Sequence, residues 1–501
     1  MQNLTVPAMA EGTAGPAPNA VPDITALPLC VDLDGTLIRT DLLLESFVAV
    51  LASRPWLVLL VPFWLIRGRA YLKSRLAERF RLDPALLPYD ERVLDYVAAE
   101  KARGRAVALV TAADHRLAGR VADHLGLFDL VMASDDRHNL SGRHKAAALL
   151  RRFGAFEYIG NGRADLVVWR NAARITVANA PAAVSRRLSR PADLLFPRPG
   201  GVWKGLVKAL RPHQWCKNLL VFVPIITANQ LGNLAAWGHA ALAFAAFCAT
   251  ASAIYIINDL TDLAADRAHP RKRRRPFASG TIPLSPGVLI LGPLLLILGL
   301  AGGAAGGVML PLCLYAATSL TYSLWLKTLP LVDVFTLAFL YVSRMIVGGI
   351  ATGFVLSLWL LGFSAFLFLA LAMVKRVSEL QASEARGALK RRGYHAQDAT
   401  MLTTMGVGAS FAAAVLLTLY VQSAEVAERY TAPYVLWLLV PLILFWQMRL
   451  WLSTSRGYML DDPIVYSGRD WVSWLVSACA VAVMMAAGHL SPFWLSPFRA
   501  G

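Results

Sequence analysis

The sequence predicts two domains of different fold class: an N-terminal α/β domain built on a parallel sheet, and an all-α polytopic membrane domain of about nine transmembrane helices. The composition changes sharply near residue 200, across a stretch rich in Pro and Gly. Before this stretch, short apolar strands alternate with helical stretches. After it, apolar runs of about 20 residues alternate with short loops, as expected of membrane helices.

Composition sets the expected boundaries and the class of ligand. We expect a disordered lead-in over residues 1–26, the α/β domain over 27–188, a linker over 189–204 and the membrane domain over 205–501. The lead-in lacks the basic start and apolar core of a signal peptide. The formal net charge is +17, which in a membrane protein indicates basic cytoplasmic loops and anionic lipid or phosphate ligands, and not nucleic acid.

Polar side chains follow the strands expected in the first domain. The expected strands span residues 27–31, 106–110, 156–159 and 174–177. Helices such as 90–103 and 117–125 lie between them. Because the carboxyl ends of parallel strands share one edge of the sheet, polar groups just past them should converge. The groups expected there are Asp32, Asp34, Thr111, Lys145 and Asp165.

The run Asp32-Leu33-Asp34-Gly35-Thr36 resembles the opening D-x-D-G-T motif of the haloacid dehalogenase (HAD) phosphatase superfamily. The resemblance covers residues 27–180 and implies a Rossmannoid fold. It implies that Asp32 is the nucleophile and Asp34 the general acid/base. Thr111 and Lys145 would then contact the phosphate.

The same resemblance implies a metal site. Asp32, Asp34 and Asp165 would hold Mg²⁺. The family usually has an acid where this chain has Asn161, which removes a negative charge from that site. An inactive HAD scaffold kept for stability or docking is therefore the alternative to a working phosphatase.

An apolar stretch at residues 47–66 lies between the first two HAD motifs. Trp and Arg flank it, and Pro55 and Pro62 break it, so its uninterrupted core is short for a membrane span. We expect a cap helix that lies on the membrane surface. A buried cap helix is the alternative.

The second domain offers nine apolar spans, and its basic loops suggest their orientation. The expected spans are 219–231, 236–257, 287–300, 308–324, 332–352, 356–374, 401–421, 433–452 and 471–487. The loops rich in Lys and Arg follow every second span, so they share one face, which should be cytoplasmic. We expect an integral inner-membrane protein with the HAD-like domain and the membrane active site on the cytoplasmic side.

Acidic residues at helical spacing follow the second span. Asn258, Asp262 and Asp266 fall at i, i+4 and i+8, and Asp259 flanks the same face of a helix. Carboxylates this close repel one another unless a cation binds them, and Mg²⁺ takes a few carboxylates and then substrate phosphate oxygens. The same argument admits Mn²⁺. The basic segment that follows would hold the rest of a polyphosphate through Lys272, Arg273 and Arg275.

This stretch and three others resemble the UbiA prenyltransferase superfamily, and within it the decaprenyl-phosphate phosphoribosyltransferase branch. The stretches are residues 210–218, 258–270, 322–327 with Asp333, and 375–380. The resemblance covers residues 205–490. Aromatic prenyltransferases of this superfamily usually have a second aspartate-rich motif in the later cytoplasmic loop, where this chain has Lys375, Arg376 and Glu379. That exchange favours a donor with an extra phosphate, such as phosphoribosyl diphosphate (PRPP).

The resemblance implies transfer of 5-phosphoribose from PRPP to a polyprenyl phosphate. Asp259, Asp262 and Asp266 would be catalytic and, with Asn258, would hold the metal. The other residues that would bind substrate are Gln214, Lys217, Asn218, Tyr322, Lys327, Asp333, Arg344, Lys375, Arg376 and Glu379. Arg344 lies inside a span, where an Arg usually faces a cavity or an acid, and Asp333 is a distant candidate partner.

Two other functions stay open. One is ordinary prenyl transfer from a prenyl diphosphate to an aromatic or other small acceptor. The other is a non-enzymatic transporter or scaffold whose basic loops bind anionic lipid, although that function leaves the aspartate face unexplained. We expect PRPP, polyprenyl phosphate and membrane lipids as partners, expect no nucleic acid, and leave a homo-oligomer open.

Overall fold

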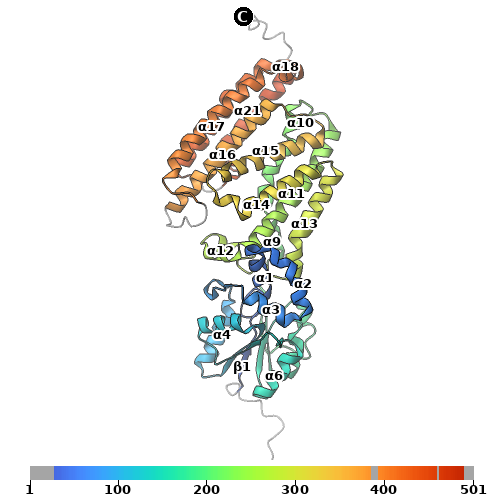
Figure 1. Cartoon of the computed structure of the whole chain (residues 1–501), viewed down its shortest axis with the longest axis vertical. Helices are drawn as coiled ribbons and strands as arrows, with labels where there is room; N and C mark the ends of the chain where they lie inside the picture. Colours follow the sequence, from blue (N-terminus) through green and yellow to red (C-terminus); the bar gives the residue numbers. More distant parts are fainter. Residues whose placement is uncertain (1–26, 385–392, 460–461, 490–501) are drawn as a thin grey trace, which may run out of the picture. The chain divides into compact units, whose positions relative to one another are not determined.

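The computed structural model describes residues 27–384, 393–459 and 462–489 (Figure 1). The chain divides into two compact units. The first unit comprises the residues up to Gly201 together with residues 267–274 and 278–284. The second unit comprises the remaining residues from Val202 onward.

The first unit contains a six-stranded parallel sheet. Its strands are β1 Leu29–Val31, β2 Val107–Asp114, β3 Leu130–Ser134, β4 Glu157–Gly160, β5 Arg174–Ala178 and β6 Leu194–Phe196. Their order is β3-β2-β1-β4-β5-β6, so β1 lies between β2 and β4. The predicted α/β fold with a parallel sheet is confirmed. Strands β3 and β6 were not predicted, because both lie at sheet edges and are only partly buried, which weakens their apolar pattern.

The alternation of side chains along β1 places a hydrophobic core on each face of the sheet. Leu29 and Val31 pack on one face with α4 and α5, and Cys30 packs on the other with α6 and α7. Figure 1 shows α4 and α6 on opposite sides of the sheet. The helices that cover the two faces of the sheet are α4 Glu91–Ala102, α5 His115–Leu125, α6 Arg143–Phe153, α7 Asp165–Asn171 and α8 Ala182–Ser185.

A cap of short helices follows β1. Its elements are α1 Leu42–Ser53, η2 Pro55–Leu60, α2 Val61–Ile66, α3 Arg69–Ala77 and η3 Pro84–Leu86. The expected single helix over residues 47–66 is therefore broken, because Pro55 begins a 3₁₀ turn. The side chains of Trp56, Leu59, Phe63 and Ile66 are 64, 71, 66 and 83% exposed. Clustered exposed apolar side chains are typical of a surface that contacts a membrane or another protein.

The second unit is entirely helical in the residues that the structure describes. Its elements are α9 Val202–Leu210, η4 Pro212–Phe222, α10 Val223–Thr227, α11 Leu234–Thr261, α12 Leu263–Ala268, α13 Pro286–Ala305, α14 Met309–Leu324, η6 Leu326–Thr328, α15 Val332–Thr352, α16 Leu358–Glu384, α17 Asp398–Val421, α18 Ala424–Arg429, η7 Pro433–Leu438, α19 Leu439–Ser455, α20 Pro463–Ser467 and α21 Trp471–His489. The short helix η5 Lys272–Arg274 belongs to the first unit.

Seven helices of the described chain are long and apolar enough to cross a membrane, so the expected count of about nine is not confirmed. The two expected spans that fall short differ in kind. Helix α14 is apolar but has only 16 residues. The expected span over 219–231 is divided between the end of the 3₁₀ helix η4 and the five-residue helix α10, because Pro224 interrupts it.

One close approach brings η4 against α15. A Cβ atom added at Gly348 would clash with the backbone of Val221, so only glycine lets the two elements approach this closely. One turn earlier on α15, Arg344 lies next to Asn218 of η4. The glycine contact therefore fixes the distance between two elements that carry candidate site residues.

Candidate active sites

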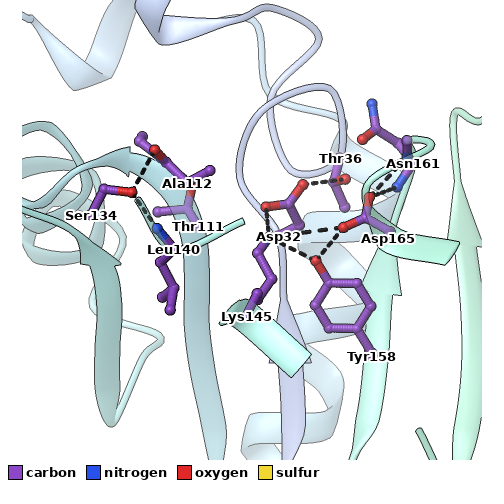
Figure 2. Close-up of polar contacts among 12 residues, drawn as sticks. Asp32, Thr36, Thr111, Ala112, Ser134, Leu140, Lys145, Tyr158, Asn161 and Asp165 are labelled. Atoms are coloured by element: carbon purple, nitrogen blue, oxygen red, sulfur yellow. Dashed lines mark hydrogen bonds and ion pairs between the residues drawn. The ribbon is translucent and has the colours of Figure 1, made fainter. Parts of the chain in front are cut away.

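The expected residues of the first unit meet at the carboxyl edge of the sheet (Figure 2). Asp32 follows β1 directly and accepts a hydrogen bond of 2.8 Å from the Nζ of Lys145 on α6. The hydroxyl of Thr36 donates to the other oxygen of Asp32, at 3.4 Å. All three side chains are buried. The structure thus places one carboxylate and one ammonium group together, as a phosphate-binding nucleophile site requires.

Burial shifts the acidity of both aspartates of the opening motif. Burial raises the pKa of Asp32 to about 6, although the Lys145 ammonium opposes the shift. Burial and the neighbouring Asp41 carboxylate raise the pKa of Asp34 well above its usual value. The carboxyl of Asp34 also accepts a hydrogen bond of 2.9 Å from the backbone N–H of Leu42. A raised pKa favours the protonated form of the Asp34 carboxyl, which is the form that a general acid requires.

Tyr158 of β4 joins the lysine to the third acid. Its hydroxyl accepts from Lys145 at 2.8 Å and donates to Asp165 Oδ1 at 2.7 Å. The backbone N–H groups of Asn161 and Gly162 donate to Asp165 Oδ2 at 3.0 and 2.8 Å. Figure 2 shows this chain of contacts from Asp32 to Asp165. Tyr158 was not predicted as a site residue, because a tyrosine inside a buried strand is usually a core residue.

A second lysine at this site, Lys73 of cap helix α3, was not predicted either. Its Nζ donates to the carbonyl of Ala112 at 2.5 Å and to Asn139 Oδ1 at 2.8 Å. Burial lowers the pKa of Lys73, against the pull of the Asp34 and Asp41 carboxylates. Thr111, the expected phosphate ligand, is buried and its hydroxyl accepts from the N–H of Ala113 at 3.0 Å. Lys73 therefore joins the cap helix α3 to the part of strand β2 that carries Thr111.

The donor set for a metal is partial at this edge. The Asp165 carboxylate lies close enough to Asp32 to help raise the pKa of Asp32, and the two acids could share a divalent cation. The side chain of Asn161 lies against Gly35, whose φ of +73° allows the tight loop after β1. Asn161 could supply an amide oxygen, which is a weaker ligand for Mg²⁺ than a carboxylate.

In the second unit the acidic stretch is divided between two helices. Helix α11 ends at Thr261 and α12 begins at Leu263, but the bonds from Asp262 N to Asn258 O and from Asp266 N to Asp262 O continue the helical spacing, at 3.0 and 2.8 Å. Asp259 and Asp266 face the same guanidinium. Arg275 Nη1 lies 3.0 Å from Asp259 and 2.6 Å from Asp266. Asp262 instead pairs with Lys327, at 3.4 Å.

Asp259 and Asp266 are the two enclosed carboxylates of the stretch, each 2% exposed. Asp259 also pairs with Arg211. Its Oδ2 atom is buried without a hydrogen-bond partner in the described structure. Among the described residues no group of three His, Cys, Asp or Glu is already arranged around a metal position. The orphaned oxygen and the neighbouring carboxylates nevertheless fit a hard divalent cation, provided that the arginines exchange their partners.

Lys375 and Arg376 are adjacent on α16 but have different partners. Lys375 Nζ lies 3.0 Å from Asp462 Oδ2, and Lys217 of η4 lies 2.7 Å from the same oxygen. Tyr341 of α15 donates to both oxygens of Asp462, at 3.3 Å. Asp462 was not predicted as a site residue. Its signal was its place before Pro463, which is typical of a helix N-cap, and its side chain does accept from the N–H of Ile464 at 3.2 Å.

Arg376, by contrast, forms ion pairs with two acids. It pairs with Asp333 at 2.5 Å and with Glu379, and it contacts the hydroxyl of Tyr322 at 3.4 Å. The hydroxyl of Tyr394 donates to Asp333 at 2.6 Å. Asp333 is therefore the partner of Arg376 and not of Arg344. Because Arg376 is 1% exposed and paired, this cluster ties α15 to α16.

Arg344 is a buried guanidinium among aromatic rings. It donates to Asn218 Oδ1 at 2.9 Å, to the hydroxyl of Tyr315 at 3.3 Å and to the carbonyl of Leu340. No described carboxylate forms an ion pair with it. Of the remaining expected residues, Gln214 is partly exposed on η4, and Lys272 and Arg273 are exposed on η5 of the first unit.

Each of the two units matches a known protein family. Residues 219–458 match the UbiA prenyltransferase family, and residues 29–168 match the haloacid dehalogenase-like hydrolases. The protein y4nM of Sinorhizobium fredii is 36% identical over 92% of this chain and 91% of its own length. The nodulation protein NoeC of Azorhizobium caulinodans is 35% identical over 52% of this chain and 86% of its own length.

Other relatives are named as transferases. A decaprenyl-phosphate phosphoribosyltransferase of Mycobacterium tuberculosis is 33% identical over 42% of this chain and 71% of its own length. Among solved structures, a UbiA homologue from Archaeoglobus fulgidus bound to GPP and Mg²⁺ is 20% identical over 57% of this chain and all of its own, with a TM-score of 0.45. A phosphoserine phosphatase is 16% identical over 36% of this chain and 98% of its own, with a TM-score of 0.26.

Proposed function

Because the chain belongs to the UbiA prenyltransferase family and carries a haloacid dehalogenase-like domain at its N-terminus, we propose that its membrane unit transfers 5-phosphoribose from PRPP to a polyprenyl phosphate. The observation that carries the proposal is the pair of ammonium groups on Lys217 and Lys375. Lys375 stands where, by the family resemblance, aromatic prenyltransferases usually have a second aspartate-rich motif, and Lys217 of η4 reaches the same oxygen of Asp462. Cations at this position favour a donor with more phosphate groups and disfavour a second metal.

The acidic stretch would hold the divalent cation. Asp259, Asp262 and Asp266, with Asn258, would hold Mg²⁺ or Mn²⁺, which would neutralise charge on the diphosphate. The support is the buried, unpartnered Oδ2 of Asp259 next to Asp266. Both families are typically dependent on divalent metals.

The cations that now pair with the aspartates would bind the leaving group. Arg211, Arg275 and Lys327 each contact a carboxylate of the stretch, so a diphosphate at the same place could accept their hydrogen bonds. A lipid phosphate oxygen attacks the anomeric carbon, the bond from that carbon to the diphosphate oxygen breaks, and diphosphate leaves with the electron pair. The basic groups stabilise the charge that develops on the leaving oxygen.

The first unit would act on the product. Polyprenylphosphoryl-5-phosphoribose keeps a 5-phosphate, and the sheet-edge site has the groups that remove one. Asp32 attacks the phosphorus, Asp34 gives its proton to the departing sugar oxygen, and water later hydrolyses the aspartyl phosphate. Lys145 and Thr111 bind the phosphate oxygens. We place both sites on the cytoplasmic side of the inner membrane, since the basic loops share one face.

A substrate comparison tests the transfer. The full chain in lipid nanodiscs is incubated with PRPP and decaprenyl phosphate, or with geranyl diphosphate and an aromatic acid, and the lipid products are separated by mass spectrometry. We expect a phosphoribosylated lipid from the first pair only. A prenylated aromatic acid from the second pair alone would replace the proposal with ordinary prenyl transfer, and no product from either pair would favour the scaffold.

A further inference from the structure

The hydroxyl of Tyr158 lies between an ammonium group and a carboxylate at the carboxyl edge of the sheet (Figure 2). It is 2.8 Å from Lys145 Nζ and 2.7 Å from Asp165 Oδ1. Lys145 Nζ itself lies 2.8 Å from Asp32 Oδ1 and 3.9 Å from Asp165 Oδ1. Two buried carboxylates thus compete for one ammonium group, and only Asp32 is within hydrogen-bonding distance of it.

The hydrogen bonds of Tyr158 have a fixed direction. Lysine has only donors, so the Tyr158 oxygen accepts from Lys145 and gives its own proton to Asp165. Burial raises the pKa of Tyr158 well above its usual value, so the hydroxyl keeps that proton. The other oxygen of Asp165 accepts from the backbone N–H groups of Asn161 and Gly162. Both oxygens of Asp165 therefore have donors without a hydrogen bond from Lys145.

The phenol ring of Tyr158 is held in place by the sheet and by a neighbouring indole. Tyr158 lies in β4 opposite Cys30 of β1, and Cys30 is two residues before Asp32, so strand pairing fixes the tyrosine relative to the aspartate. The ring of Trp169 packs edge-on against the phenol, with ring centres 6.4 Å apart. The side chain is fully buried. A ring constrained in this way presents its hydroxyl at one place.

Lys145 has one more N–H group than these partners use. An ammonium group carries three donors, and among the described residues one goes to Asp32 and one to Tyr158. The third can go to a phosphate oxygen while the ammonium stays beside the nucleophile. If Lys145 instead closed the gap of 3.9 Å to Asp165, the ammonium would leave Asp32. A phosphate held at Asp32 would then lose its contact with Lys145.

We infer that Tyr158 is a positioning residue of the phosphate site: its hydroxyl satisfies Asp165 and thereby keeps the Lys145 ammonium on Asp32. The inference rests on the proposed phosphatase step, because a phosphate at Asp32 is the ligand that Lys145 would hold. It adds to that step a residue that acts through Lys145 and does not itself touch the reacting atoms.

The test measures binding of inorganic phosphate to the full chain in nanodiscs by calorimetry, in EDTA so that no metal contributes. Lys145→Met identifies the part of the binding heat that belongs to this site, since the membrane unit can also bind phosphate. Tyr158→Phe removes one oxygen and keeps the ring. We expect this variant to raise the dissociation constant of the Lys145-dependent site about tenfold, the size expected for one lost hydrogen bond to a charged group.

Asp165→Asn tests the competition directly. If Tyr158 acts by satisfying Asp165, its hydroxyl matters only while a charged Asp165 competes for Lys145. Tyr158→Phe should therefore raise the dissociation constant about tenfold in the wild-type background and less than about twofold in the Asp165→Asn background. A hydroxyl that only stabilises the fold would give the same change in both backgrounds, so an equal loss in both overturns the inference.

Tyr96→Phe is the matched control. Tyr96 of α4 donates to Glu157 Oε1 at 3.2 Å, and Glu157 precedes Tyr158 in β4, so its side chain lies on the opposite face of the sheet. The variant loses the same atom from a hydrogen bond outside the site and should bind phosphate like the wild type.

The remaining outcomes separate the inference from the function on which it rests. If Tyr158→Phe alone does not fold, Asp165→Asn and the double variant remain, and a difference of about tenfold between them overturns the inference. Unchanged binding to Tyr158→Phe overturns it as well but leaves the phosphatase step standing. No Lys145-dependent binding in the wild type overturns the phosphate site itself.

Discussion

At the scale of single residues, Asp262 and Asp266 offer the sharpest test of the metal assignment, because they pair with different cations. Asp266 shares Arg275 with Asp259, whereas Asp262 pairs with Lys327. If all three hold one cation with the diphosphate, losing either acid removes a ligand at the reacting end of the donor.

We therefore expect Asp262→Ala and Asp266→Ala each to lower the transfer rate at least a thousandfold, while Arg456→Lys, at an exposed position, leaves it unchanged. Product formation from PRPP and decaprenyl phosphate measures the effect. Excess EDTA should stop the wild-type reaction, and added Mg²⁺ or Mn²⁺ should restore it. Full activity in EDTA contradicts the assignment.

The acidity of Asp32 predicts the pH dependence of the phosphatase step. Burial raises its pKa to about 6, and only the ionised carboxylate can attack phosphorus. We expect kcat/KM for dephosphorylation to fall about tenfold per pH unit below pH 6 and to level off above it. Stopped assays between pH 4.5 and 8 measure the profile. A rate that stays constant down to pH 4.5 would show that the ionisation of Asp32 does not limit the step.

At the scale of elements, α17 predicts the sidedness of two loops. It spans 24 residues, which is about 36 Å and enough to cross a bilayer. Residue 393 precedes it and residue 425 follows it. Cysteines at Gly393 and Glu425, introduced into a chain without its five native cysteines, should react with a membrane-impermeant thiol reagent from opposite sides. Reaction from the same side would contradict the expected topology.

The cap elements η2 and α2 predict contact with lipid. Their exposed side chains include Leu59 and Phe63, which a water-facing surface does not favour. A fluorophore at Leu59→Cys in the full chain should be quenched by spin-labelled lipids in nanodiscs. A fluorophore at Asp123→Cys, on exposed polar surface of α5, is the control and should not be quenched. Equal quenching at the two positions would favour a cap that does not lie on the membrane.

At the scale of the whole molecule, the two units predict two successive reactions. Wild type should accumulate the dephosphorylated lipid, because Asp32 removes the 5-phosphate that the membrane unit leaves on its product. Asp32→Asn should accumulate the phosphorylated lipid at an unchanged rate of transfer. Mass spectrometry of the extracted lipids measures both products. If both proteins give only the phosphorylated lipid, the first unit serves as a scaffold and Asn161 is the first residue to suspect.

The sequence by itself determined the features that depend on neighbours along the chain. Asp32 lies at the carboxyl end of the parallel strands because an apolar strand ends there. The helical period of 3.6 residues fixes the spacing of Asp259, Asp262 and Asp266. The fold classes of both units followed from the same local patterns. The number of spans did not, because a run such as 219–231 can be apolar and still be divided by a proline into short turns.

Only the tertiary structure decided which charges meet. Lys217 and Asp462 are 245 positions apart, and Lys145 and Asp32 are 113 apart, so no local pattern pairs them. Lys375 and Arg376 are adjacent in sequence, yet about 100° of helical rotation turns one toward Asp462 and the other toward Asp333. Local sequence spacing determines the position of a residue on its helix or strand. The long-range packing of helices and strands determines which side chains it contacts.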